Sequence, residues 1–454
     1  MAMWTQIKQL AAQTPPERNR YVDFLRAISI LVVITGHWLI ATSWYVDGEL
    51  ASGHLLKSHP QTQWLTWLFQ VMPIFFIVGG YSNAVSLESA RRNGIDYAGW
   101  LVTRLNRLVA PLLVLVIAWA ILGLVMRLFG VAPALIQFAS QASLIPTWFL
   151  AIYIMVVILA PLTYRYWQRS GFTSFWVLVV VALLVDVLFF SADLEWLGWS
   201  NYFWVWLSVH HLGYAWRDGK LPGSSMLLLI AAIGLGALAL MIVWGPYPLA
   251  MVGSPDEGLS NTLPPKATLI ALATFQFGIL LALEGPMRRA LSSLRLWAAT
   301  VLVNTMIMTV YLWHITVMII LIAVLVLLGG IGLELEPGTP TWWYSRPIWI
   351  LVLIALLTPV ALLMSPLERR PRSPDAGVLQ PVRQAPGFPL QVLELHRVFP
   401  SGCLGVLSLV AKGRLDLSLA GSEAELGCVE RVEEVDVDLL RIPLRQEHRV
   451  HPGP

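Results

Sequence analysis

The chain has 454 residues, of which 57% are hydrophobic and 13% are charged. A soluble domain usually carries about 25% charged residues, so this composition indicates a protein whose main solvent is lipid. The formal net charge of +3 is too small to favour nucleic acid as a partner. The two cysteines, Cys403 and Cys428, give neither a disulfide framework nor the spacing of a metal site, and we expect no bound metal.

Ten apolar runs are predicted to form transmembrane helices, because roughly 20 apolar residues in a helix cross the hydrocarbon core of a bilayer. The runs cover residues 22–43, 64–87, 109–129, 146–163, 173–191, 201–216, 224–244, 266–284, 297–328 and 347–366. The sixth run is short and polar, and the ninth is long enough to tilt or to project beyond the bilayer. The first 20 residues are polar and do not resemble a cleavable signal peptide.

Charged residues in the loops predict the orientation of the chain. With the N-terminus inside, most of the loop arginines and lysines fall on the cytoplasmic side, as the positive-inside rule requires. Losing one span would spoil this alternation, which is why the sixth run is kept. The sequence therefore predicts an all-α, polytopic protein of the plasma (inner) membrane, with about ten transmembrane helices and with N- and C-termini cytoplasmic.

The composition changes at about residue 371, beyond which Trp and Tyr are absent and charged residues are frequent. A small folded domain, a disordered tail and a non-native or frame-shifted extension all stay open for this part, and we attach no function to it. The predicted organisation is a cytoplasmic segment 1–20, a transmembrane domain 21–370 and a cytoplasmic tail 371–454.

The most informative spacing lies in the first predicted span. Arg26 and His37 are 11 positions apart, which on a helix is about three turns plus 20°, so both project from one face. They are separated by ~16 Å along the helix axis, which puts Arg26 near the cytoplasmic surface and His37 well inside the membrane. Asp23 precedes Arg26 by three residues and is close enough to pair with it.

An ionisable residue in the apolar zone is costly, which makes His37 a candidate for function. A neutral imidazole can accept the proton of a hydroxyl as a general base. Two structural interpretations stay open. His37 could only hydrogen-bond another helix, and Arg26 could be a positive-inside anchor whose side chain snorkels to the headgroups. The shared face favours a joint role for the two residues.

Five short motifs follow one another along the chain. They are Asp23-Phe-Leu-Arg26 with Arg26-x10-His37, Pro73-Ile-Phe-Phe-Ile-Val-Gly-Gly-Tyr81, Arg104-Leu-Asn-Arg107-Leu-Val-Ala-Pro111, Trp148-Phe-Leu150 and Tyr311-Leu-Trp-His314. In this combination the chain resembles the acyltransferase-3 family of membrane acyltransferases over residues 21–314. One position departs from the family pattern: the usual Ser of the second-helix motif is Gly79 here, which could mark a subfamily with another acceptor.

The resemblance implies transfer of an acyl group, by default acetyl, from cytoplasmic acyl-CoA to a hydroxyl of a glycan, lipid or other small acceptor of the cell envelope. His37 would carry the chemistry, with Arg26 and Asp23 in support. Arginine binds phosphates bidentately, and the candidate CoA-binding residues are Arg104, Arg107, Arg91 and Arg92. The candidate acyl-site residues are Tyr81, Trp148, Tyr311 and His314. The candidates to stabilise the oxyanion are Tyr81, Asn83 and Trp148.

Other polar residues within the predicted spans are expected mainly to hydrogen-bond neighbouring helices. They are Asp186, His210, His211, Glu284 and Asn304. The adjacent histidines at 210 and 211 point in different directions and make a poor metal pair.

Two other functions stay open. A transporter or exporter could use intramembrane carboxylates and histidines as a proton relay, although no clear inverted repeat relates the two halves of the chain. A non-catalytic relative of the family could serve as a scaffold or sensor, but a scaffold has no need of the Arg26–His37 pair. Direct transfer and an acyl-histidine intermediate are both compatible with the sequence.

Overall fold

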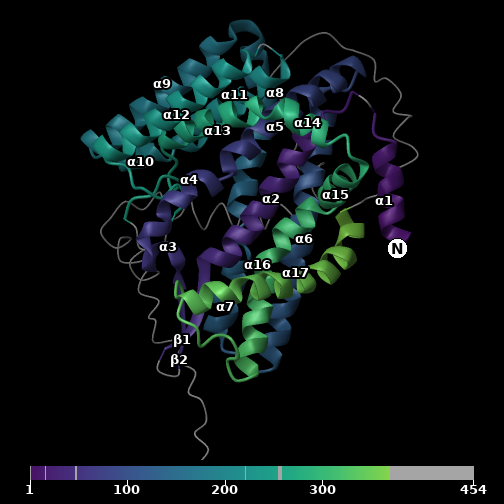
Figure 1. Cartoon of the computed structure of the whole chain (residues 1–454), viewed down its shortest axis with the longest axis vertical. Coiled ribbons are helices and arrows are strands. Elements are labelled where there is room, and N and C mark those ends of the chain that lie inside the picture. Colours follow the sequence, from purple (N-terminus) through teal and green to yellow (C-terminus); the bar gives the residue numbers. More distant parts are fainter. Residues whose placement is uncertain (1, 16, 47–48, 220, 254–257, 369–454) are drawn as a thin grey trace, which may run out of the picture. The chain divides into compact units, whose positions relative to one another are not determined.

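The computed structural model describes residues 2–15, 17–46, 49–219, 221–253 and 258–368. The predicted tail, 371–454, lies outside the described residues. Helices make up most of the described chain (Figure 1). The elements are α1 (Ala2–Ala12), α2 (Arg20–Ile40), β1 (Ala41–Val46), β2 (Glu49–His54), α3 (Leu55–Ser58), η1 (Pro60–Leu65), α4 (Thr66–Phe69), α5 (Met72–Arg92), α6 (Tyr97–Leu128), α7 (Pro133–Ser143), α8 (Thr147–Ser170), α9 (Phe172–Ser191), α10 (Glu195–Gly198), α11 (Asn201–Arg217), α12 (Ser224–Trp244), α13 (Thr268–Ala282), α14 (Glu284–Ala290), α15 (Leu294–Thr305), α16 (Ile307–Leu327) and α17 (Pro340–Glu368).

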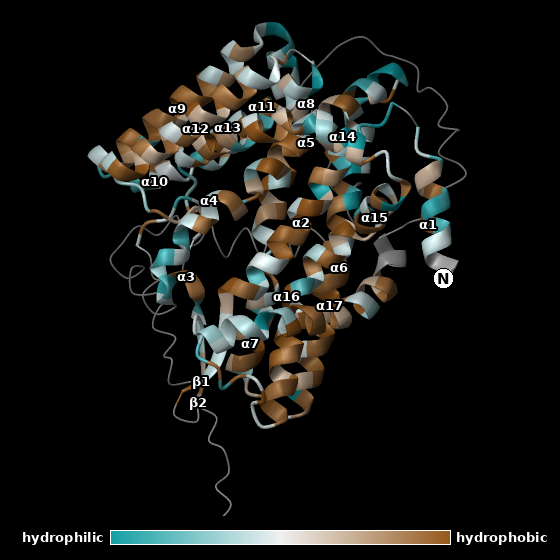
Figure 2. Ribbon diagram, viewed as in Figure 1, coloured by the Kyte–Doolittle hydropathy of each residue, from teal (hydrophilic) through white to brown (hydrophobic). Residues whose placement is uncertain are grey.

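The long helices carry apolar residues on their outer faces. Among the described residues, eight helices are long and apolar enough to cross a membrane, and the bent pair α13–α14 raises the number to nine. The brown colour along α6, α12 and α17 shows these faces (Figure 2). Leu124, Val243 and Leu363 are 61%, 71% and 71% exposed. Apolar surface on this scale is stable only when hydrocarbon covers it, so these helices lie in a bilayer.

α11 shows why the sixth apolar run is so polar. It has 17 residues and packs against α5, α8, α9 and α13, so that every side chain from Val205 to Trp216 is buried. A helix surrounded by protein needs no lipid-facing stripe, and its polar groups can bond to neighbouring helices. Each of the ten predicted runs overlaps at least one helix, and in the described part of the chain eight or nine helices are long and apolar enough to cross a membrane.

Two glycines let α11 pack closely on α5. A Cβ atom at Gly80 would lie 2.0 Å from the carbonyl oxygen of His210, and one at Gly213 would lie 2.1 Å from that of Ile77. Any larger residue at either position would push the two backbones apart, as at other close helix contacts in membranes. This contact fixes the middle of α5 against the buried helix.

The prediction that the fold is all α is wrong for residues 41–46 and 49–54. There the chain forms an antiparallel hairpin, β1–β2, whose register begins with Ala41 opposite His54. The Thr, Trp, Tyr and Val residues of β1 favour extended backbone. The N–H of Tyr45 donates to the carbonyl of Leu333 at 2.7 Å, which ties the hairpin to the loop between α16 and α17.

The predicted ninth span, 297–328, is two helices rather than one. The helix breaks at Met306, whose φ of −125° lies outside the helical range, and this residue separates α15 from α16. α15 packs against α1, and Trp297 donates its indole N–H to the carbonyl of Ala11 at 3.2 Å. The predicted N-terminal segment 1–20 therefore contains a helix that is fixed to the bundle.

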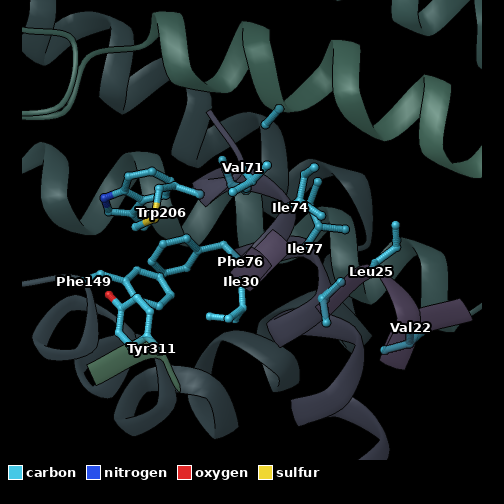
Figure 3. Close-up of a cluster of buried hydrophobic side chains, with 14 of the residues drawn as sticks. Val22, Leu25, Ile30, Val71, Ile74, Phe76, Ile77, Phe149, Trp206 and Tyr311 are labelled. Carbon is cyan, nitrogen blue, oxygen red and sulfur yellow. The ribbon is translucent and has the colours of Figure 1, made fainter. Parts of the chain in front are cut away.

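A row of aromatic side chains joins four helices at the centre of the bundle. Trp206 of α11 stacks on Phe76 of α5 with ring centroids 4.3 Å apart. Phe76 meets Phe149 of α8 edge to face at 5.6 Å, and Phe149 meets Tyr311 of α16 at 6.0 Å. Figure 3 shows these rings gathered beside Ile30 of α2. Edge-to-face contacts have a specific geometry, so the row fixes α16 relative to α5 and α8.

Candidate active site

The first part of the site is built at the N-terminal end of α2. Asn19 caps this helix by accepting hydrogen bonds from its first backbone N–H groups. About two turns after this cap, Arg26 donates from Nη1 to Asp23 Oδ1 at 3.1 Å and from Nη2 to Ser82 Oγ of α5 at 2.8 Å. The predicted pair between Asp23 and Arg26 is therefore present, and Arg26 is also bound to Ser82 on a second helix.

The buried carboxylate of Asp23 is shared by two arginines. Its second oxygen accepts a hydrogen bond from Arg18 Nε at 2.6 Å, and Asn304 donates to its backbone carbonyl at 2.9 Å. The hydrogen bond to Asp23 raises the pKa of the Arg18 guanidinium above its ordinary value. One carboxylate between two guanidinium groups leaves the cluster net positive. The sequence interpretation missed Arg18, because it lies in the polar segment before the first span.

A cavity of about 530 Å³ opens beside this cluster. Arg26 and Arg104 both line it, and Arg104 donates to the backbone carbonyl of Ser82 at 3.2 Å. Ser82 therefore contacts both arginines, one through its hydroxyl and one through its backbone. The Arg104 guanidinium lies 5.8 Å from the ring centre of Trp100, a cation–π distance. Nothing marks Ser82 in the sequence except its place directly after the second-helix motif.

The other three predicted CoA-binding arginines do not line this cavity. Arg107 is exposed one turn beyond Arg104 on α6, and Arg91 and Arg92 are exposed at the C-terminal end of α5. Arg107 still lies near enough to Arg104 to act on it electrostatically. The matched motif on α6 thus contributes one arginine to the cavity rather than two.

The second part of the site lies three turns further along α2. His37 Nδ1 is 2.8 Å from Nε2 of His314 on α16. The two ring planes differ by 14°, and the ring centroids are 5.1 Å apart. With the two nitrogens only 2.8 Å apart, the ring centroids can be as far apart as 5.1 Å only if the rings lie edge to edge in one plane. The nitrogens therefore meet in the ring planes, where an N–H and a lone pair point at each other.

His314 is held in place from several sides. Its Nδ1 is 2.5 Å from the carbonyl oxygen of Tyr311, and its own carbonyl accepts the indole N–H of Trp38 at 3.0 Å. The Tyr311 hydroxyl in turn donates to the carbonyl of Pro146 at 2.6 Å. His314 is 0% exposed, whereas His37 is only partly buried. His37 is therefore the member of the pair that a substrate can reach.

A third imidazole approaches the pair from the hairpin. His54 of β2 lies near enough to His37 to act on it electrostatically. Burial lowers the pKa of His54 to about 4, because the charged form loses its hydration. His54 is therefore neutral at pH 7 and adds no charge beside His37.

The remaining predicted acyl-site residues lie apart from one another. Tyr81 lines the cavity, where Asn19 Nδ2 lies 3.4 Å from its hydroxyl. Trp148 is partly buried against the hydrophobic core of the bundle. Tyr311 belongs to the histidine end of the site, through its contact with His314. The structure thus separates Tyr81 from Tyr311 and His314, which lie at opposite ends of α2.

Polar residues elsewhere in the spans join helices, as expected. Asn83 Nδ2 of α5 is 3.1 Å from Nε2 of His210, so this candidate oxyanion stabiliser sits in a buried contact with α11. Asp186 of α9 accepts hydrogen bonds from Asn201 at 2.8 Å and from Tyr247 at 3.1 Å. These contacts join neighbouring helices and lie outside both parts of the site.

Gly79, which departs from the family pattern, lies against Tyr153 of α8. A Cβ atom at this position would be 2.8 Å from the Tyr153 ring and 3.2 Å from its hydroxyl oxygen. Tyr153 thus fills the space that a serine side chain would need, and the departure has a local packing reason.

The bundle thus carries a reachable imidazole and an arginine-lined cavity on the same helix. Comparison with known families identifies the class. A family model described as an acyltransferase domain, Acyl_transf_3, matches residues 19–365, which is most of the chain. The chain belongs to this family of membrane acyltransferases, and the resemblance seen in the sequence is confirmed. No curated protein and no solved structure matches the chain significantly.

Proposed function

We propose that this protein transfers an acyl group, acetyl by default, from acyl-CoA to a hydroxyl of a glycan, lipid or other small acceptor. The observation that carries the proposal is the division of α2 into a basic, cavity-lining end and an imidazole end, in a chain of the acyltransferase family. In the orientation favoured by the positive-inside rule, the cavity faces the cytoplasm, where acyl-CoA is found.

The cavity suits the phosphates of the donor. Arg26 and Arg104 are both tied to Ser82, so their guanidinium groups are already ordered before a ligand arrives. Preordered guanidinium groups lose little conformational entropy on binding and can engage phosphate oxygens bidentately. Trp100 and Tyr81 in the lining add flat aromatic surface. We assign the anionic part of the donor to this cavity.

The imidazole end would carry out the transfer. Neutral His37 accepts the proton of the acceptor hydroxyl, and the freed oxygen attacks the thioester carbonyl carbon. The tetrahedral intermediate then collapses as the carbon–sulfur bond breaks, and the departing thiolate takes the proton from the His37 imidazolium. The products are the ester and free CoA, with His37 neutral again.

The donor must bridge the two ends, which are ~16 Å apart along the helix axis. The pantetheine arm of CoA is a long, flexible chain that ends in the thioester, so it is the part suited to this span. Ile30 and Ile34 of α2 lie between the ends and are both buried. We therefore expect donor binding to move side chains around these two residues.

The test is binding and turnover by the purified protein in nanodiscs. Calorimetry with acetyl-CoA should show micromolar affinity, which Arg104→Met weakens and the exposed Arg107→Met leaves within about threefold. Mass spectrometry should detect acetylated products from pooled glycan and lipid acceptors, and none with His37→Ala. A folded wild-type protein that binds neither acetyl-CoA nor longer acyl-CoAs would contradict the proposal and favour a transporter.

A non-catalytic relative is separated from an enzyme by the same experiment. A scaffold or sensor would bind its ligand equally well with and without His37, and it would form no product. Binding of acetyl-CoA without any transfer, over acceptors that include envelope lipids and glycans, would support that alternative.

A further inference from the structure

The hydrogen bonds around His314 determine where its proton lies. A backbone carbonyl can only accept, so the 2.5 Å contact with the Tyr311 carbonyl requires a proton on His314 Nδ1. In a neutral imidazole the other nitrogen then carries a lone pair. His314 is fully buried, and the partners of its two nitrogens are a carbonyl and another imidazole, neither of which would compensate a positive charge. Its Nε2 is therefore an acceptor.

The proton position of His314 in turn determines that of His37. The lone pair of His314 Nε2 faces His37 Nδ1 at 2.8 Å in the common ring plane, so His37 Nδ1 must be the donor. A neutral His37 that carries its proton on Nδ1 has a free lone pair on Nε2. This is the tautomer that a general base acting through Nε2 requires.

We propose that His314 is a positioning residue that fixes His37 in the tautomer with Nδ1 protonated and Nε2 free to accept a proton. The assignment of the reaction rests on the proposed function; the assignment of the tautomer rests only on the contacts. His314 does not touch the substrate, because it is completely buried. It acts through the bond to His37, as a carboxylate does in a Ser-His-Asp triad.

The surroundings of His314 keep this arrangement rigid. The Trp38 indole N–H binds the His314 carbonyl at 3.0 Å, which joins α2 to α16 beside the pair. The Tyr311 hydroxyl binds the Pro146 carbonyl at 2.6 Å, and the Tyr311 ring meets Phe149 at 6.0 Å. The carbonyl that orients His314 is therefore on a helix turn fixed to α8, so the proton position is set by packing that does not involve the substrate.

The hydrogen bond between His37 and His314 becomes stronger during the proposed reaction. When His37 takes the hydroxyl proton on Nε2, it becomes an imidazolium whose Nδ1–H is a stronger donor. The neutral lone pair of His314 then accepts a charge-assisted hydrogen bond, which stabilises the developing charge. The proton returns from His37 Nε2 to the departing thiolate, and His314 keeps its own proton throughout.

Two substitutions separate positioning from packing. His314→Gln can place an amide oxygen near the former Nε2 position and so keep an acceptor for His37 Nδ1, whereas His314→Leu has a similar volume and no acceptor. We expect His314→Leu to lower kcat roughly 10²–10⁴-fold, with the Kd for acetyl-CoA within about threefold of wild type. His314→Gln should recover at least about tenfold of that loss. Monodisperse protein with wild-type Kd confirms that both variants are folded.

A spectroscopic readout tests the tautomer without turnover. In protein labelled with ¹⁵N-histidine, the His37 signals, assigned by difference from His37→Ala, should show protonation on Nδ1. In His314→Leu this preference should be lost. A wild-type His37 protonated on Nε2, or a His314→Leu enzyme with kcat within about threefold of wild type, would overturn the proposal. Because the spectrum needs no acceptor, it decides the tautomer even if the protein transfers no acyl group.

Discussion

The two ends of α2 differ in electrostatic character: one carries charged groups and the other carries neutral imidazoles. At the N-terminal end, Arg18, Asp23 and Arg26 form a charged cluster beside a cavity, and their charges are paired or lie near solvent. At the other end, His37 and His314 are joined by a hydrogen bond between neutral rings. The first arrangement suits the binding of an anion, and the second suits the movement of a proton. In the proposed function, one helix thus separates donor recognition from chemistry by three turns.

This difference teaches how a membrane protein can use ionisable groups at different depths. A permanent charge is costly in hydrocarbon, so it stays where water or a counter-ion can reach it. Imidazole is neutral in its resting state and acquires charge only during the reaction, so it can lie deeper. Exchanging the roles of the two ends would place an uncompensated guanidinium in the dry part of the bundle.

The largest effect should come from the histidine end. His37→Ala removes the proposed base, and we expect the transfer rate to fall roughly 10³-fold or more. Donor affinity should stay within about threefold, because the cavity lies three turns away. Product formation and calorimetry on the same preparation provide the two readings. A variant that keeps more than a tenth of the wild-type rate would show that another group is the base.

The next largest effect should come from the cavity end, with the opposite pattern. Arg26→Met and Arg104→Met each remove charged hydrogen-bonding capacity, worth about 1.5–3 kcal/mol, so the Kd for acetyl-CoA should rise roughly 10–100-fold. Arg107→Met, exposed on the same helix as Arg104, is the matched control. Equal losses for Arg104→Met and Arg107→Met would mean that general positive charge, and not the cavity, attracts the donor.

A smaller effect is expected at Gly79 of α5, the helix that also carries Ser82. Gly79→Ser would bring a Cβ atom to 2.8 Å from the Tyr153 ring, and overpacking of this kind costs about 1–3 kcal/mol. The melting temperature should fall, and a second change, Tyr153→Leu, should restore part of it by making room. Additive losses in the double variant would show that the two residues do not compete for one space.

The last prediction concerns only stability and a buried cation outside both ends. Lys266 precedes α13, is 0% exposed, and its Nζ lies 3.4 Å from the ring centre of Phe189. Burial lowers the pKa of Lys266 to about 8 from an ordinary value of 10.5. Between these two pH values the unfolded chain holds the proton and the folded chain does not, so stability should rise with pH.

Lys266→Met should lack this rise, because it cannot titrate. Melting temperatures measured in nanodiscs from pH 7.5 to 10.5 would show the slope in the wild-type protein and a smaller slope in the variant. Parallel curves would mean that Lys266 is hydrated in the folded protein. The difference between wild type and Lys266→Met measures the cost of burying a cation whose hydrogen bonds no carboxylate accepts. Arg26, by contrast, donates to Asp23.

The sequence predicts those elements that face lipid, because an apolar run is a strong local signal. It cannot predict that α11 is enclosed by four helices, that the chain turns into a hairpin after α2, or that α15 and α16 separate at Met306. These features depend on contacts between distant segments. The Asp23–Arg26 pair was predictable because it is local, whereas the contact between His37 and His314 joins residues 277 positions apart.

The break at Met306 has a mechanical consequence. α2 is tied to α15 through Asn304 and to α16 through His314, so the two ties lie on opposite sides of the break. Without a continuous ladder of helical hydrogen bonds, a twist or a shift of α15 is not transmitted as a rigid-body motion to α16. A movement of α15 would therefore reach the two imidazoles only through α2, which runs unbroken from Arg26 to His37.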